Sequence, residues 1–189
     1  MTSPSTLILV QKARQGDSAA RSALIQRYYQ DWLDKFHGDL GKTVRKLYDT
    51  DDLVQSAIAD ALRDLFSLRN EGVFYAWVTS IIRHKITVRR RRLAKEVPLS
   101  SSSAPGAAGP AAAQEIAHKS LEQEETYLQT LDAILALFPE HPEEMTAVVL
   151  KVLDERTIRF IAEFLDAPER TVFRRLQDGV ALLKERLGS

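Results

Sequence analysis

The segment IAEFLDAPERTVFRRL, residues 161–176, decides the fold of the C-terminal third of the chain. Apolar residues at helical spacing lie on both sides of Asp166-Ala167-Pro168, a stretch that favours a tight turn. Ala162 is small enough to lie where two helices cross, and Val172 can hold the second helix against the first, supported from inside by Leu176, Val180 and Leu183. Aspartate tolerates the left-handed conformation such a turn requires. The spacing therefore predicts a helix-turn-helix.

The second helix of this motif has a polar outer face. With Val172 buried, the residues pointing outward are Arg170, Thr171, Arg174 and Arg175. Arginines near the start of such a helix can pair with guanine in the major groove, while Thr171 and the helix N-terminus take phosphate. Many packed helical hairpins share this pattern, so a hairpin that does not bind DNA stays open as an alternative.

The remainder of the chain also has helical period, and no strand alternation extends beyond a few residues. The expected helices cover Thr6–Gln15, Asp17–Gly38, 51–66, Val73 to the tract Arg89–Arg92, 128–138, a helix from Pro142, Thr157–Leu165 and Pro168–Leu187. Gly16 can end the first of these helices and Asp17 can cap the second, whose apolar positions Leu24, Tyr28, Trp32 and Phe36 recur every four residues. Between them, Pro98–Ala113 has no periodicity and no charge, which is typical of a flexible linker. We predict an all-α protein of two small helical bundles, tethered by this linker and not required to pack together.

Composition excludes several classes of function. The chain has no cysteine, which removes disulfides and thiolate sites and suits a reducing cytoplasm. The apolar run Leu7–Val10 is too short to span a membrane. The four histidines are scattered, and there is neither an H-E-x-x-H motif nor a glycine-rich phosphate loop. We therefore expect a cytoplasmic protein that is not an enzyme, with no catalytic residue, metal or cofactor and no membrane partner.

The net charge of zero hides an asymmetry along the chain. Residues 1–95 carry a net charge of +7, residues 96–169 carry −10, and residues 170–189 carry +3. Two basic zones on either side of an acidic one indicate two separate contacts with polyanions. Solvated faces that cluster by chance would give the same numbers.

The predicted helix 51–66 has a mixed outer surface. Its buried face carries Val54, Ala57, Ile58, Ala61 and Leu65, and the opposite face carries Asp52, Ser56, Ala59 and Arg63, with Gln55 at the edge. Small, polar and apolar groups mixed in this way suit docking against another helix. An ordinary amphipathic helix is the alternative.

The next predicted helix is long and basic at its end. Phe74, Trp77, Val78 and Ile81 share one face, but continuing that face brings in Lys85 and Arg92. Charged groups are costly to bury without partners, so we expect the helix to extend beyond its core as a projecting basic rod. Charge can follow a nucleic-acid backbone while an exposed aromatic residue, Phe74 or Tyr75, stacks on unpaired bases. A packed position for Tyr75 stays open as an alternative. We expect Trp77 to be a core residue.

Taken in series, these segments resemble the sigma factors of bacterial RNA polymerase. DDLVQSAIADALRDL (51–65), FYAWVTSIIRHKI (74–86) and the arginine run resemble sigma region 2, and LDAILALFPEHPEEMTAVVL (131–150) with residues 161–176 resembles sigma region 4. Two regions and no third domain is the layout of the extracytoplasmic-function (ECF) subfamily. The resemblance implies region 2 over 1–95, an Ala/Pro/Ser/Gly-rich linker over 96–121 and region 4 over 122–189.

The resemblance also implies roles for individual residues. Core RNA polymerase would bind Asp52, Gln55, Ser56 and Arg63, although Ser56 stands where the family usually has glutamate. The opened −10 element of promoter DNA would bind Tyr75, Arg83, Lys85, Thr87, Arg90 and Arg91. The −35 element would bind Arg170, Thr171, Arg174 and Arg175. An anti-sigma factor is the further expected partner.

Two other functions are compatible with parts of the sequence. A helix-turn-helix regulator that acts without polymerase would explain the C-terminal half, but not the mixed helix 51–66 or the basic helix after it. A sigma-like protein-interaction module, in which region 4 docks protein in place of DNA, would suit a weakly basic reader helix.

Overall fold

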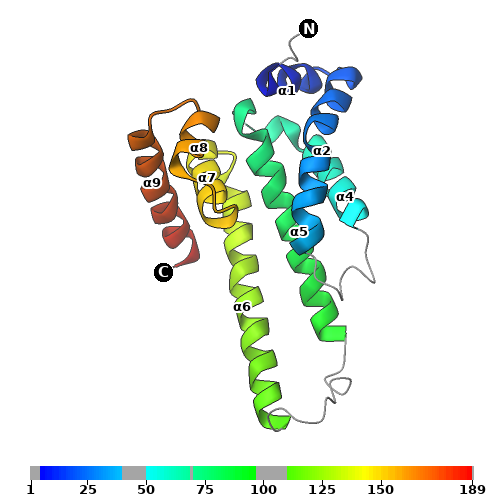
Figure 1. The fold of residues 1–189 in the computed structure, drawn as a ribbon, viewed down its shortest axis with the longest axis vertical. Coiled ribbons are helices and arrows are strands. Elements are labelled where there is room, and N and C mark those ends of the chain that lie inside the picture. Colours follow the sequence, from blue (N-terminus) through cyan, green and yellow to red (C-terminus); the bar gives the residue numbers. More distant parts are fainter. Residues whose placement is uncertain (1–4, 40–49, 69, 97–109, 189) are drawn as a thin grey trace.

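The computed structural model describes residues 5–39, 50–68, 70–96 and 110–188, and the regular elements in these ranges are all helical. This confirms the all-α prediction. The N-terminal half, residues 5–96, contains α1 (Thr6–Arg14), α2 (Ser18–Asp39), α4 (Thr50–Arg63), η1 (Leu65–Ser67), η2 (Glu71–Val73) and α5 (Phe74–Glu96). The C-terminal half, residues 110–188, contains α6 (Pro110–Leu137), α7 (Pro142–Val148), η4 (Val149–Leu153), α8 (Ile158–Phe164) and α9 (Glu169–Leu187) (Figure 1).

Local caps set the start of the N-terminal half. The Ser5 hydroxyl accepts a hydrogen bond from the Ile8 amide at 3.4 Å and so caps α1. After α1 the chain turns at Gly16, whose φ of 92° lies in the left-handed region. The Asp17 carboxylate then accepts from the Ala20 amide at 3.0 Å, capping α2. The predicted break at Gly16 and cap at Asp17 are both confirmed.

The core of the N-terminal half forms where α2, α4 and α5 meet. Leu24, Trp32 and Phe36 of α2 are fully buried, as the four-residue spacing predicts. The predicted inner face of α4 is buried too: Val54, Ala57, Ile58 and Ala61, followed by Leu65 of η1. Trp77 is buried, which confirms its place in the core.

The helix-turn-helix of the C-terminal half forms as predicted, with one exception. Asp166 has a φ of 47° at the turn, and Val172 is fully buried between the two helices. Val180, which we expected to support Val172 from inside, is 39% exposed and so does not. Gly179 takes the inner position, because α9 approaches α7 too closely for a larger residue.

Part of the range predicted as a linker is helical. Residues 97–109 lie outside the described residues, but α6 begins at Pro110, so residues 110–121 are helical within the range 96–121. Proline at the first position of a helix costs nothing, and alanine, which fills 111–113, has the highest helix propensity.

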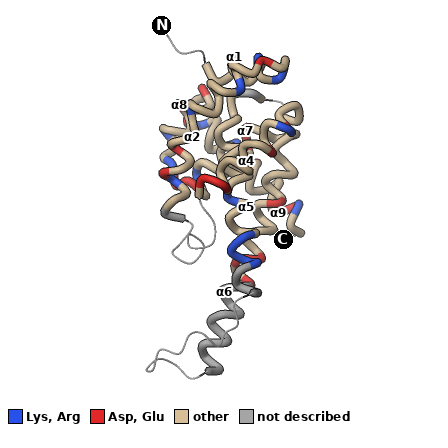
Figure 2. Tube along the Cα trace, turned by 90° about the vertical axis from the view of Figure 1, so that its right-hand side faces the viewer, with Lys and Arg blue, Asp and Glu red and all other residues tan. Residues whose placement is uncertain are grey.

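The two halves pack together, an arrangement that the tether allows but does not require. Their buried apolar residues form one continuous cluster, and α5 runs antiparallel to α6 along much of its length (Figure 1). The prediction that α5 projects beyond Lys85 is therefore wrong. Ile86 and Thr87 are buried, and Arg91 forms an ion pair with Glu125 of α6, where basic and acidic residues lie close together (Figure 2).

We predict that Gly179→Ala destabilises the protein, although alanine is the better helix former by about 1 kcal/mol. An added Cβ would lie 2.8 Å from Val148 Cγ2 and 3.1 Å from the Glu144 carbonyl oxygen. The branched valine cannot move away freely, so we expect the free energy of unfolding to fall by about 1–2 kcal/mol in urea titrations.

The double variant Gly179→Ala/Val148→Ala is the control for this clash. It should lose less stability than the sum of the two single variants, because Val148→Ala removes the atom that the new Cβ meets and the new Cβ fills part of the space left by the valine. A gain in stability for Gly179→Ala alone would show that the close approach imposes no constraint.

Candidate nucleic-acid interface

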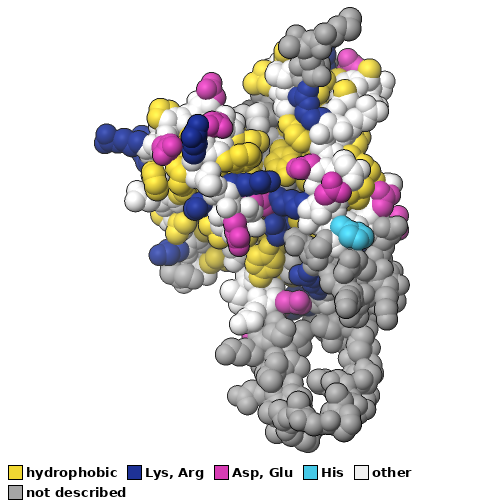
Figure 3. Space-filling view, in the orientation of Figure 1, with side chains coloured by type: hydrophobic (Ala, Val, Ile, Leu, Met, Phe, Trp, Pro, Cys, Tyr) yellow, Lys and Arg dark blue, Asp and Glu magenta, His cyan; other side chains and the backbone are white. Residues whose placement is uncertain are grey.

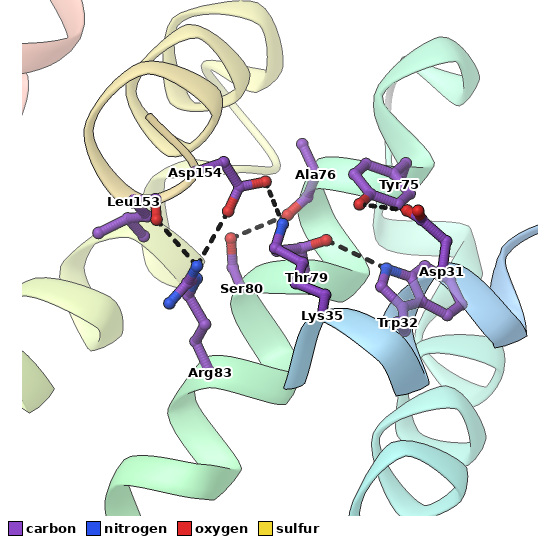
Figure 4. A network of polar contacts seen from close by, with 10 residues as sticks. All are labelled: Asp31, Trp32, Lys35, Tyr75, Ala76, Thr79, Ser80, Arg83, Leu153 and Asp154. Atoms are coloured by element: carbon purple, nitrogen blue, oxygen red, sulfur yellow. Dashed lines mark hydrogen bonds and ion pairs between the residues drawn. The ribbon is translucent and has the colours of Figure 1, made fainter. Parts of the chain in front are cut away.

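A buried ion-pair cluster joins the two halves (Figure 4). Arg83 of α5 donates one hydrogen bond to the Asp154 carboxylate at 3.1 Å and another to the Leu153 carbonyl at 2.8 Å. Lys35 of α2 pairs with the other carboxylate oxygen of Asp154. The Asp154 side chain is 0% exposed. We call the contact surface around these residues the seam; both cations come from the N-terminal half and the anion from the C-terminal half.

Burying the charged groups of this cluster costs electrostatic free energy. Burial lowers the pKa of Lys35, because the ammonium group loses water, and Arg83 adds repulsion in the same direction. Asp154 opposes both by attraction and by its hydrogen bond. Aromatic rings supply further contacts: the Lys35 ammonium lies 5.5 Å from the Tyr75 ring centroid, and the Arg83 guanidinium lies 5.4 Å from that of Phe36.

Tyr75 lies beneath the seam, not on an open surface. It is 7% exposed, its ring stacks on Trp32 at 5.7 Å between centroids, and its hydroxyl donates to Asp31 at 2.7 Å. Burial raises its pKa, with the Asp31 hydrogen bond as the second cause. On the other side, the ring of Phe164 from α8 lies 6.4 Å away. The predicted availability of Tyr75 for base stacking is therefore wrong for this arrangement of the two halves.

The other residues predicted to bind the −10 element lie along α5 in different surroundings. Lys85 pairs with Asp60 at 2.6 Å and donates to Ser56 at 2.9 Å, both on α4. Thr87 is buried, and its hydroxyl donates to the Arg83 carbonyl at 2.9 Å. Arg90 and Arg91 are half-buried. These residues share a helix, but they do not form one open basic face.

The residues predicted to dock polymerase do share an exposed surface on α4. Asp52, Gln55, Ser56 and Arg63 are all exposed, and Arg63 pairs with Asp60 at 3.2 Å. The hydrogen bond from Lys85 holds the pKa of Asp60 below its usual range. Between α4 and α5 runs a groove of 520 Å³ lined by both kinds of candidate, Asp52 and Ser56 on one side and Lys85 on the other.

The predicted reader face of α9 is split. Arg170 and Arg174 are exposed and Thr171 is half-buried. Arg175 was expected to point outward, but its side chain is 16% exposed and pairs with Glu143 of α7. Glu143 also accepts a hydrogen bond from Asn70 of the N-terminal half at 3.1 Å.

Sequence reasoning missed Lys35, Asp154 and Glu143. Lys35 is one of several cations on an amphipathic helix, and no local pattern separates it from a solvated lysine. The signal that existed was global: an acidic stretch of net charge −10 follows a basic one of +7, which favours pairing between them as much as pairing with DNA.

The described ranges contain no group of three or more His, Asp or Glu side chains placed to hold a metal ion. None of their helices is both long and apolar enough to cross a membrane.

The fold combines a helix-turn-helix, α8 and α9, with a helix rich in arginine, α5, in the other half of the chain. This combination is typical of proteins that recognise DNA. A family model described as "ECF sigma factor" matches residues 5–187, so the chain belongs to the ECF sigma factor family. It is similar to the ECF RNA polymerase sigma-E factor of Haemophilus influenzae, with 29% identity over 174 residues that cover 89% of this chain and 87% of that protein. The protein is thus a sigma factor that directs RNA polymerase to promoters, and the alternative of a regulator acting without polymerase is not favoured.

We predict that Thr79→Val destabilises the packing of Trp32 and Tyr75 beneath the seam. The buried Trp32 indole N–H donates to the Thr79 hydroxyl at 3.1 Å, and valine keeps the shape but removes this acceptor. A buried donor left unpaired costs about 1–3 kcal/mol of unfolding free energy, measurable by urea titration. Thr79→Ser keeps the hydroxyl and should lose less; equal losses would show that the hydrogen bond contributes nothing.

Proposed function

We propose that the two halves divide the work of promoter recognition. Residues 1–95 bind core polymerase and the opened −10 element, and residues 122–189 read the −35 element. The observation that carries this proposal is that candidate residues are exposed at two places, one in each half of the chain: Asp52, Gln55, Ser56 and Arg63 on α4, and Arg170 and Arg174 on α9. The protein acts by binding, in the cytoplasm, and performs no catalysis of its own.

Polymerase docking is assigned to the outer face of α4. Asp52, Gln55, Ser56 and Arg63 lie exposed on a helix whose opposite side is firmly buried, so their positions are fixed before a partner arrives. A rigid helix face loses little conformational freedom on binding. In this family the partner surface is the clamp helices of the largest polymerase subunit.

The −10 element is assigned to α5 and the loop before it. Arg83, Lys85, Thr87, Arg90 and Arg91 would contact the backbone of the opened strand, and Tyr75 would meet an unpaired base. Capture of flipped bases makes single-stranded DNA the better ligand, so promoter opening is driven by differential binding and needs no ATP. This assignment requires the seam to open, because Tyr75, Arg83 and Thr87 lie under it.

The −35 element is assigned to α9. Arg170 and Arg174 extend from a helix held in place by Val172, and Thr171 lies beside the helix N-terminus, where phosphate is favoured. Arg175 would join them only by leaving Glu143. By analogy with the family, we also propose an anti-sigma factor as the partner that keeps the protein inactive.

Reconstitution with sigma-free core polymerase tests the proposal. We expect the purified protein to co-purify with core and to produce transcripts that begin at defined positions on genomic fragments of its source. Arg63→Ala together with Gln55→Ala should weaken co-purification without changing the melting temperature. Failure of the wild-type protein to bind core would contradict the proposal.

Promoter choice should depend on the start of α9. We expect Arg170→Ala and Arg174→Ala each to weaken binding to promoter DNA by about 1–3 kcal/mol per lost base contact, measured with assembled holoenzyme. Arg186→Ala, an exposed change at the far end of the same helix, is the matched control and should have little effect. If all three variants select promoters equally well, α9 docks protein and does not read DNA.

A further inference from the structure

The cluster at the seam has the chemistry of an occupied anion site. Two cations from different helices, Lys35 of α2 and Arg83 of α5, converge on the two oxygens of one carboxylate. The carboxylate is supplied by the other half of the chain, from Asp154 at the end of η4. A guanidinium and an ammonium placed in this way bind a phosphate as readily as a carboxylate.

We propose that Lys35 and Arg83 form a binding site for a backbone phosphate of promoter DNA, and that Asp154 occupies this site as an intramolecular latch until the two halves separate. The proposal rests on the proposed function, since it deepens the assignment of α5 to the −10 element. It adds Lys35 as a DNA-binding residue and gives Asp154 a regulatory role.

The composition of the α5 face that the C-terminal half covers supports the proposal that the two halves can separate. Ala76, Ser80, Arg83 and Thr87 share one side of the helix, spaced at four, three and four residues. Ala76, Ser80 and Thr87 are buried, and both hydroxyls donate to carbonyls of their own helix, Ser80 to Ala76 and Thr87 to Arg83, each at 2.9 Å. A permanent core would be expected to place apolar side chains here. Small and polar residues leave a surface that water or DNA can contact once it is uncovered.

The ion pairs at the edge of the seam have the same arrangement of charges as the buried cluster. His84 of α5 lies 2.9 Å from Asp132 of α6, and Arg91 of α5 pairs with Glu125 of α6. In each case the N-terminal half supplies the basic group and the C-terminal half the acid. Figure 3 shows basic side chains gathered at the middle of this face, with acidic ones beside them, where the two halves meet. The acidic stretch thus covers the basic surface in the manner of a polyanion.

Closure has a defined effect on affinity. If only a fraction of molecules is open, the apparent affinity for DNA is the affinity of the open form multiplied by that fraction, and weakening the closed state raises it. Asp154→Asn keeps the shape of the side chain and removes the negative charge with which both Lys35 and Arg83 pair. Both side chains are mostly covered in the closed form and gain water when the halves separate, so the substitution should favour the open form.

The first experiment measures opening directly. Because the sequence has no cysteine, nitroxide labels can be attached uniquely at Ala19→Cys on α2 and Ala181→Cys on α9, both exposed. Pulsed electron–electron double resonance should give a narrow distribution of distances between the two labels in the otherwise wild-type chain. Asp154→Asn should shift it to longer, broader distances, and Glu155→Gln, an adjacent exposed change of equal charge, should not.

The second experiment measures the phosphate site. The probe is a fluorescein-labelled single-stranded DNA oligonucleotide of mixed sequence, since a backbone contact is independent of sequence. We expect Asp154→Asn to bind it roughly tenfold more tightly than the wild type, and Glu155→Gln to bind like the wild type. Adding Lys35→Gln to Asp154→Asn should lower the slope of log affinity against log salt by about 0.7, the value for one lost phosphate contact. Lys12→Gln, an exposed cation on α1, is the control.

The outcomes separate the latch from the function it rests on. Unchanged distances and unchanged affinity in Asp154→Asn would overturn the latch, even if the wild type directs promoter-specific transcription. If adding Lys35→Gln to Asp154→Asn leaves the slope of log affinity against log salt unchanged, the phosphate site is overturned. A wild type that gives no transcript with core polymerase would overturn the proposed function alone. If Asp154→Asn fails to fold, oligonucleotide added to the doubly labelled wild type decides: the distances should lengthen, and binding without any change contradicts the latch.

Discussion

The carboxylate of Asp154 cannot remain buried without cations, and this requirement ties the two halves together. Removing water from a carboxylate costs several kcal/mol, which only well-placed opposite charges recover. Lys35 and Arg83 are those charges, and they are held in place by α2 and α5, whose own positions follow from the burial of Trp32, Phe36 and Trp77. The position of η4, and of the helix-turn-helix that follows it, depends on this contact.

The same contact divides the surface of the protein into accessible and covered parts. The outer face of α4 and the start of α9 are exposed, whereas the face of α5 with Ser80, Arg83 and Thr87 is covered. The surface assigned to polymerase is therefore available at once, and the surface assigned to opened DNA is not. With the DNA surface covered, the free protein would bind nucleic acid weakly. The covered face of α5 would become accessible only during assembly with polymerase.

The helices and their caps could be predicted from local sequence because their causes are local. Gly16, Asp17 and Asp166 each have a short-range conformational reason, and the four-residue spacing along α2 follows from helix geometry alone. The seam could not be predicted in the same way, since Lys35 and Asp154 are 119 residues apart and neither belongs to a motif. The error over α5 has the same origin: its arginines beyond Lys85 indicated solvent, but Arg91 pairs with Glu125 of α6, which is distant in the sequence. Whether DNA contacts these residues stays a prediction.

The most direct measurement is the reactivity of a single thiol placed under the seam. Ser80→Cys puts a sulfur at a fully buried position of a chain that has no other cysteine. With iodoacetamide, we predict slow modification in the free protein and roughly tenfold faster modification when core polymerase is added. Ala19→Cys, exposed in the free protein, corrects for general effects of polymerase. Equal rates for Ser80→Cys with and without polymerase, whether slow or fast, would contradict a seam that is closed in the free protein and opens on assembly.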